Sequence, residues 1–168
     1  MTVRNLDHAL APRSVAVIGA STEEGSVGGT LTKNVLAGGF KGEVYLVNPH
    51  HDAIGGRRCF LDIAALPEAP ELAVIATPPG TVPELVGALG KKGTRAVVVI
   101  TAGLGPELKQ AMLDQARPYL LRIIGPNCWY CSSRTWSACE FRSKPAGTGK
   151  ARLPLSIGCP RHRHPRLG

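Results

Sequence analysis

The residues best suited to chemistry in this sequence form a glycine-rich stretch near its start. Gly19, Ala20 and Ser21 directly follow the apolar run 14–18, and further glycines stand at positions 25, 28 and 29. Small residues after a strand let a ligand approach backbone N–H groups, and the N-terminus of a following helix favours a phosphate. The pattern therefore predicts a phosphate-binding loop.

The dinucleotide NAD is not the ligand that this loop favours. The NAD fingerprint is G-x-G-x-x-G, whereas the next glycine after Gly19 is Gly25, which makes a longer loop. NAD sites also need an acidic residue at the end of the second strand, where it binds the ribose hydroxyls. Asn48 and Pro49 stand at that place here. The sequence therefore indicates a phosphate site without the carboxylate that NAD requires.

Five short apolar runs alternate with helical segments and would position this loop. The runs are 14–18, 43–47, 72–76, 96–101 and 121–124, and such runs are typical of strands buried on both faces. Helices are expected up to 37–39, over 61–66, over 82–89 with Thr81 as a cap, and from Pro106 to about Arg117. This alternation predicts an α/β fold, a doubly wound parallel sheet of about five strands.

Each predicted strand ends in small or conformationally special residues. These ends are 19–21, 48–49, 77–79, 101–103 and 125–127. Glycine and proline are also common in loops that bind no ligand, so one such strand end would be weak evidence for a binding site. Ligands of doubly wound sheets bind at the carboxyl ends of the strands, and five such ends on one rim favour a binding site there.

A resemblance to a known family rests on these same segments. The ordered motifs VAVIGAS…GSVGG, VYLVNP, IATPP, VVITAGLG and IIGPNC resemble the N-terminal CoA-binding domain of ADP-forming acyl-CoA (acetyl-CoA) synthetases. The resemblance runs from about Leu6 to Cys128, and it extends more distantly to the α subunit of succinyl-CoA synthetase. It implies a Rossmann-like domain over residues 1–128 with coenzyme A as its ligand.

The resemblance also implies which residues contact coenzyme A. The phosphates would lie against the first loop, at Gly19, Ala20, Ser21, Thr22, Gly25, Ser26 and Val27. The adenosine part would lie by Asn48 and Pro49; the family often has a lysine next, where this chain has His50 and His51. The pantetheine path would be lined by Thr77, Pro78, Pro79, Thr101, Ala102 and Gly103, with Asn127 near the thiol end.

Composition changes near Cys128. Residues 1–128 carry 12 Lys+Arg against 11 Asp+Glu, a net charge of +1, whereas residues 129–168 carry eight against one, a net charge of +7. The second part shows no apolar periodicity, so it offers little to offset the entropy lost on ordering the chain. We therefore predict one domain over 1–128 and an aberrant, disordered tail over 129–168.

Three interpretations of the tail compete. Cys128, Cys131, Cys159 and His162 could bind zinc. The basic residues, with Trp129 and Trp136 as stacking rings, could form an arm for nucleic acid. A back-translation shifted by one nucleotide over Ser156–Leu167 permits Q-S-G-A-L-A, which resembles the family's next domain, so the tail could be an out-of-frame remnant. We favour the third interpretation and expect neither a metal nor nucleic acid to bind.

The resemblance implies the activity of the parent protein. It would ligate an acyl group to coenzyme A with coupled nucleotide phosphorylation, through a phosphohistidine in another domain and with an ATP-grasp domain or subunit. This truncated chain is expected to bind CoA or acyl-CoA and to catalyse nothing alone. Alternatives are the CoA-binding domain of a lysine acetyltransferase fusion and a stand-alone CoA- or nucleotide-binding regulator. Since no apolar run reaches the roughly 20 residues of a membrane span, we expect a cytoplasmic location and no membrane binding.

Overall fold

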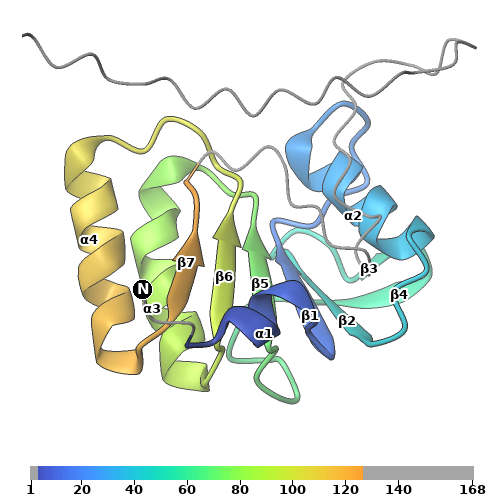
Figure 1. Cartoon of the computed structure of the whole chain (residues 1–168). Helices are drawn as coiled ribbons and strands as arrows, with labels where there is room; N and C mark the ends of the chain where they lie inside the picture. The colour runs from blue at the N-terminus through green and yellow to red at the C-terminus, as the bar shows by residue number, and fades with distance from the viewer. Residues whose placement is uncertain (1–3, 127–168) are drawn as a thin grey trace, which may run out of the picture.

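The sheet is the framework of the domain (Figure 1). The computed structural model describes residues 4–126. Its seven strands lie in the order β3-β4-β2-β1-β5-β6-β7. Their bounds are Ser14–Ile18 (β1), Glu43–Val47 (β2), Ala53–Ile54 (β3), Arg57–Phe60 (β4), Leu72–Ile75 (β5), Ala96–Val99 (β6) and Arg122–Ile124 (β7). All neighbours are parallel except β3 and β4, so the predicted doubly wound parallel sheet is confirmed, with two more strands than expected.

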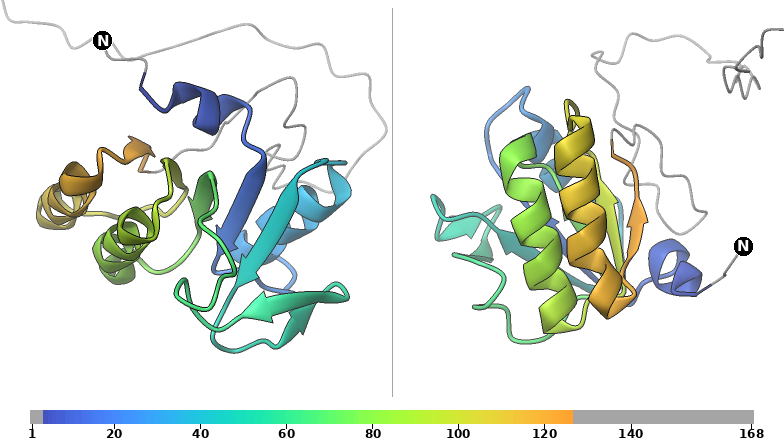
Figure 2. Two further views of the ribbon diagram at one scale, coloured as in Figure 1. Left: turned by 90° about the horizontal axis from the view of Figure 1, so that it is seen from below. Right: turned by 90° about the vertical axis from the view of Figure 1, so that its left-hand side faces the viewer.

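Helices cover both faces of this sheet. They are α1 (Leu6–Leu10), α2 (Val27–Ala37), α3 (Val82–Lys92) and α4 (Pro106–Ala116), with the short 3-10 helices η1 (Pro79–Thr81) and η2 (Arg117–Tyr119). Figure 2 shows α3 and α4 on one face and α1 on the other, and α2 lies on the α1 side. None of the helices among residues 4–126 has the length and apolar composition needed to cross a bilayer.

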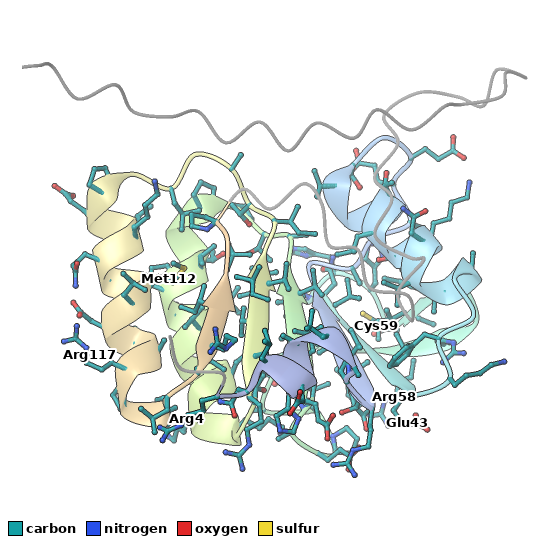
Figure 3. All side chains as sticks on the ribbon, viewed as in Figure 1. Arg4, Glu43, Arg58, Cys59, Met112 and Arg117 are labelled. Atoms are coloured by element: carbon teal, nitrogen blue, oxygen red, sulfur yellow. The ribbon has the colours of Figure 1, made fainter. Side chains whose placement is uncertain are left out.

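The sheet separates two hydrophobic clusters, as the alternation of side chains along a strand requires. In β1, Ala16 and Ile18 belong to the cluster beneath α3 and α4, which also contains Met112. Figure 3 shows Met112 on the side of α4 that faces α3. Val15 and Val17 belong to the cluster beneath α2. Because both faces are covered, every residue of β1 is buried, and this explains the continuous apolar run in the sequence.

Two sequence-based expectations for local structure are wrong. Residues 61–66 form bends and turns and not a helix. The Asp62 carboxylate accepts a hydrogen bond from the Ala65 amide (2.7 Å) as a helix N-cap would, but Pro67 disfavours helical backbone at the residue before it, so the turn does not continue as a helix. Thr81 does not cap α3, since its hydroxyl donates instead to the Pro78 carbonyl (2.8 Å) within the turn formed by η1. Asn127 and the segment 129–168 lie outside the described residues.

Candidate functional site

A cavity of about 870 Å³ opens at the carboxyl ends of β1, β2 and β5. The chain passes from β1 to β2 on one side and returns to β5 on the other, so the order of the strands reverses between β1 and β5. Such a reversal leaves a crevice in which doubly wound proteins bind their ligands. Four segments line the cavity: the first loop with the start of α2, residues 47–50, residues 61–63, and residues 76–78 with Thr81 and Leu85.

Two glycines allow the first loop to pack directly against the sheet. Gly19 has φ +86°, and a Cβ there would lie 2.7 Å from the Ala76 carbonyl oxygen. A Cβ on Gly28 would overlap the carbonyl oxygen of Gly19. The start of α2 therefore sits against the end of β1, with no side chain between them. Because of this close approach, residues at the N-terminus of α2 line the cavity.

Hydroxyl groups fix the shape of the first loop. Ser26 is the N-cap of α2: its Oγ accepts from the Gly29 amide (2.9 Å) and donates to the Glu23 carbonyl (2.9 Å). The Ser21 Oγ accepts from the Glu23 amide (3.0 Å). Amides of a first helical turn have no carbonyl partner within the helix, and two residues of that turn, Val27 and Gly28, line the cavity. They can therefore donate to an anion, which the positive end of the helix dipole also favours.

Asn48 joins the two loops that flank the cavity. Its Nδ2 donates to the Ala20 carbonyl (2.7 Å), and its Oδ1 accepts from the His50 amide (2.8 Å). Its own backbone amide donates to the Phe60 carbonyl (3.0 Å). Asn48 therefore lines the cavity where the sequence predicted, and its side-chain amide is already engaged in holding the first loop to the end of β2.

An apolar wall was missed by the sequence analysis. Leu61, Ile63 and Leu85 line the cavity, and the side chain of Leu61 remains 63% exposed. The amino group of Lys92 holds the segment that carries two of them, donating to the carbonyls of Ala64 (3.0 Å) and Leu66 (2.8 Å). Because these contacts join residues 26 or more positions apart, no local motif could have predicted them.

A second hydrogen bond holds the C-terminal end of this segment, near Glu68. The Tyr45 hydroxyl donates to Glu68 Oε1 (2.6 Å). Burial of the phenol, followed by the hydrogen bond to Glu68, raises the pKa of Tyr45 to about 12. The phenol therefore stays protonated at neutral pH and keeps its role as a donor.

The predicted site residues are only partly brought together. Eight of them line the cavity: Gly19, Ser21, Ser26, Val27, Asn48, Pro49, Thr77 and Pro78. Seven others do not line it: Ala20, Thr22, Gly25, Pro79, Thr101, Ala102 and Gly103. Thr101 still supports the site, since its buried hydroxyl donates to the Thr77 carbonyl (2.8 Å). Asn127 lies outside the described residues.

The charged groups at the cavity are unusual for a phosphate site. Among residues 4–126, its ionisable side chains are those of Glu23, Asp62 and His50, with neither lysine nor arginine. Within the same range, no three histidine, cysteine, aspartate or glutamate side chains gather as a metal site requires. The candidate zinc ligands, from Cys128 onward, lie outside the described part of the chain.

A doubly wound sheet with a helix N-terminus and a cavity at its switch point defines a Rossmann-like domain. Residues 13–134 match the CoA binding domain family. The chain belongs to that family, and the resemblance found in the sequence is confirmed.

Relatives of known identity extend this result. The chain is 38% identical over 158 residues to 4-hydroxybutyrate–CoA ligase [ADP-forming] of Nitrosopumilus maritimus, covering 89% of this chain and 22% of that protein. It is 34% identical over 133 residues to acetate–CoA ligase [ADP-forming] I subunit alpha of Pyrococcus furiosus, covering 73% of this chain and 29% of that subunit.

A solved structure shows the same fold. Dinucleotide-forming acetyl-coenzyme A synthetase 1 of Ca. Korarchaeum cryptofilum, in complex with phosphate and ADP, superposes with a TM-score of 0.70 at 34% identity. The match covers 74% of this chain and 28% of that protein. The chain therefore spans less than a third of the length of each of these relatives.

Proposed function

We propose that residues 1–128 bind coenzyme A or an acyl-CoA in the cavity between β1 and β5. The observation that carries this proposal has two parts. The N-terminus of α2 lies at the cavity and can bind an anion, and Asn48 stands at the end of β2, where NAD sites have a carboxylate. A volume of about 870 Å³ lies in the range of small-molecule sites. Membership of the CoA binding domain family supports the same ligand.

Different groups of residues would contact different parts of coenzyme A. The amides of Val27 and Gly28, with the first loop from Gly19 to Ser26, would hold the phosphates. Asn48 and Pro49 would lie beside the adenosine part. Thr77 and Pro78 would follow the pantetheine arm inside the cavity, and Pro79 with residues 101–103 would meet it only beyond the cavity, with Asn127 near its thiol end. The ligand would thus bind through backbone donors and shape, and the chain would contribute no catalytic residue.

We further propose that this domain is one part of an ADP-forming acyl-CoA ligase, an acid–thiol ligase. The names of the relatives and the small share of their length that the chain spans support this. Catalysis would then need an ATP-grasp domain or subunit, and residues 129–168 would be an out-of-frame remnant. Sequencing the gene across the Cys128 codon tests the last point: a shift of frame is expected there, and an unbroken frame contradicts it.

Calorimetry with coenzyme A and with NAD tests the ligand. We expect the chain to bind coenzyme A and to show weaker or undetectable binding of NAD. Val27→Asp should abolish binding of coenzyme A, because it places a carboxylate at the helix terminus where the phosphate must lie, while a first-turn aspartate is compatible with the helix. Val27 is 41% exposed.

Leu113→Asp is the matched control, since Leu113 is 48% exposed on α4 and does not line the cavity. It should bind coenzyme A as the unmodified chain does. Tighter binding of NAD than of coenzyme A would overturn the proposal, and so would full binding by Val27→Asp.

A further inference from the structure

The apolar wall of the cavity belongs to a connection between strands that has no helix. Residues 61–71 lead from β4 to the parallel strand β5, and none of these described residues is helical. A crossover between parallel strands is usually an α-helix, whose own backbone hydrogen bonds fix its shape. Here the connection runs as an irregular trace beside α3 (Figure 2). Its order must therefore come largely from side chains.

Two buried side chains attach this connection to the core. Ile63 and Leu66 belong to the hydrophobic cluster beneath α3 and α4. The neighbouring residues are exposed, among them Leu61 at the cavity and Ala64 between the two buried side chains. Burial therefore holds the connection at two points, and the carbonyls between and after them have no donors from a helix.

The ammonium of Lys92 donates to this backbone. Lys92 is the last residue of α3 and is half-buried, and it donates to the carbonyls of Ala64 (3.0 Å) and Leu66 (2.8 Å). Hydrogen bonds from a charged donor are about twice as strong as those between neutral groups. Lys92 does not line the cavity, but it fixes the backbone one and three residues after Ile63, which does.

We propose that Lys92 is a positioning residue for the cavity: its ammonium orders residues 61–66 and so holds the apolar wall where coenzyme A binds. This inference rests on the proposed function, since it assumes coenzyme A in the cavity. Without the ammonium, the wall would have to become ordered when the ligand binds, and the entropy lost in that ordering would weaken binding. Lys92 therefore controls affinity without touching the ligand.

Hydrogen exchange on the ligand-free full chain tests whether Lys92 orders the wall. The amides of Ala65 and Leu66 are hydrogen-bonded within the connection, to Asp62 and Ile63. In Lys92→Met, which keeps an unbranched apolar side chain and removes the donors, these two amides should exchange about tenfold faster. The amides of the central strands β1 and β5 should keep their rates. Lys92→Arg should restore slow exchange, because a guanidinium can also donate to both carbonyls.

Calorimetry with coenzyme A tests whether this order matters for binding. Lys92→Met should bind about threefold to tenfold more weakly, with a less favourable entropy of binding, and Lys92→Arg should bind as the unmodified chain does. Lys91→Met is the matched control, since Lys91 is the exposed neighbour on the same helix and does not line the cavity. It should change neither the exchange rates nor the affinity.

The results separate this inference from the proposed function. Unchanged exchange at Ala65 and Leu66 in Lys92→Met, or faster exchange with unchanged affinity, would overturn the inference and leave binding of coenzyme A in place. Equally faster exchange in β1 and β5 would show a general loss of stability and would contradict a positioning role. If the unmodified chain is folded by circular dichroism but binds no coenzyme A, the proposed function fails, and the inference fails with it.

Discussion

Asn48 is the residue on which the geometry of the cavity depends most. Asn48→Ala removes the donor to the Ala20 carbonyl and the acceptor for the His50 amide. Since Ala20 is fully buried, its carbonyl would lose its partner, at a cost of about 1–3 kcal/mol in the free energy of unfolding. We expect a lower melting temperature and about tenfold weaker binding of coenzyme A, because the two loops are no longer joined. Thermal melts and calorimetry measure both effects.

Gln110→Ala is the control for this prediction. The Gln110 amide donates to Asp114 (3.0 Å) on the exposed surface of α4, so its loss should change neither quantity appreciably. An Asn48→Ala variant as stable and as tightly binding as the unmodified chain would show that the bridge contributes nothing to the site.

At the scale of single residues, the sequence predicted those parts of the site that follow one another along the chain. Gly19, Ser21, Ser26 and Val27 of the first loop and the pair Asn48-Pro49 line the cavity. Their residue types were recognisable in the sequence because the local backbone and the end of a strand demand them. Thr101 was expected at the cavity by the same rule about strand ends. However, β6 lies one strand further than β5 from the point at which the strand order reverses. Thr101 therefore contacts the site only through Thr77, to whose carbonyl its hydroxyl donates. Leu61, Ile63 and Leu85 carry no motif, and only tertiary packing brings them together.

Among the elements, α1 is joined to the beginning of the sheet through one carboxylate. Glu71 precedes β5 and accepts from the backbone amide and the guanidinium of Arg13 (both 2.8 Å), and His8 of α1 lies 3.5 Å away. Burial of the carboxylate opposes its ionisation. The hydrogen bonds from Arg13 and His8 and the charge of Arg13 outweigh burial, so the pKa of Glu71 is lowered.

A lowered pKa in the folded state makes this contribution depend on pH. Ionised Glu71 stabilises the fold above the ordinary glutamate pKa of about 4.3, and the effect is lost as the pH falls through the lower folded value. Glu71→Gln should therefore reduce the free energy of unfolding by about 1 kcal/mol at neutral pH, and the difference should shrink below about pH 4. Urea unfolding at several pH values measures it.

Glu24→Gln, at an exposed position in the first loop, serves as the control and should show no comparable difference at any pH. A deficit of Glu71→Gln that stays constant down to about pH 2 would show that ionisation of this carboxylate is not what stabilises the contact.

Elements were predictable where their pattern is continuous. The five apolar runs became β1, β2, β5, β6 and β7 because buried parallel strands need apolar residues on both faces. Strands β3 and β4 were missed because β4 contains two exposed arginines. A signal for them was nevertheless present: Gly55 and Gly56, at φ +59° and +74°, form the two-residue turn that a tight hairpin requires. The helix expected over 61–66 does not form because Pro67 disfavours helical backbone at the residue before it.

At the scale of the whole molecule, the chain spans less than a third of its ligase relatives. We therefore predict that it is not phosphorylated when incubated with γ-labelled ATP and coenzyme A. The family resemblance assigns the phosphohistidine to another domain, and His8 lies beside Glu71, at the start of the sheet and away from the cavity. Acid-labile label retained by the protein, measured after gel filtration, is the readout. A full-length relative is the positive control, and label on His50, His162 or His164 would contradict the prediction.

The hydrogen bonds that shape the first loop form within the protein alone. The backbone of Glu23 donates to the Ser21 hydroxyl and accepts from the Ser26 hydroxyl. The Thr32 hydroxyl accepts from the Ser21 amide (3.3 Å) and donates to the Gly28 carbonyl (2.7 Å). The conformational entropy of this loop is therefore lost when the domain folds and not when a ligand arrives. Because the loop is already ordered, binding needs no slow rearrangement of the protein, and diffusional encounter should set the association rate. Differences in affinity between ligands should therefore arise mainly from their dissociation rates.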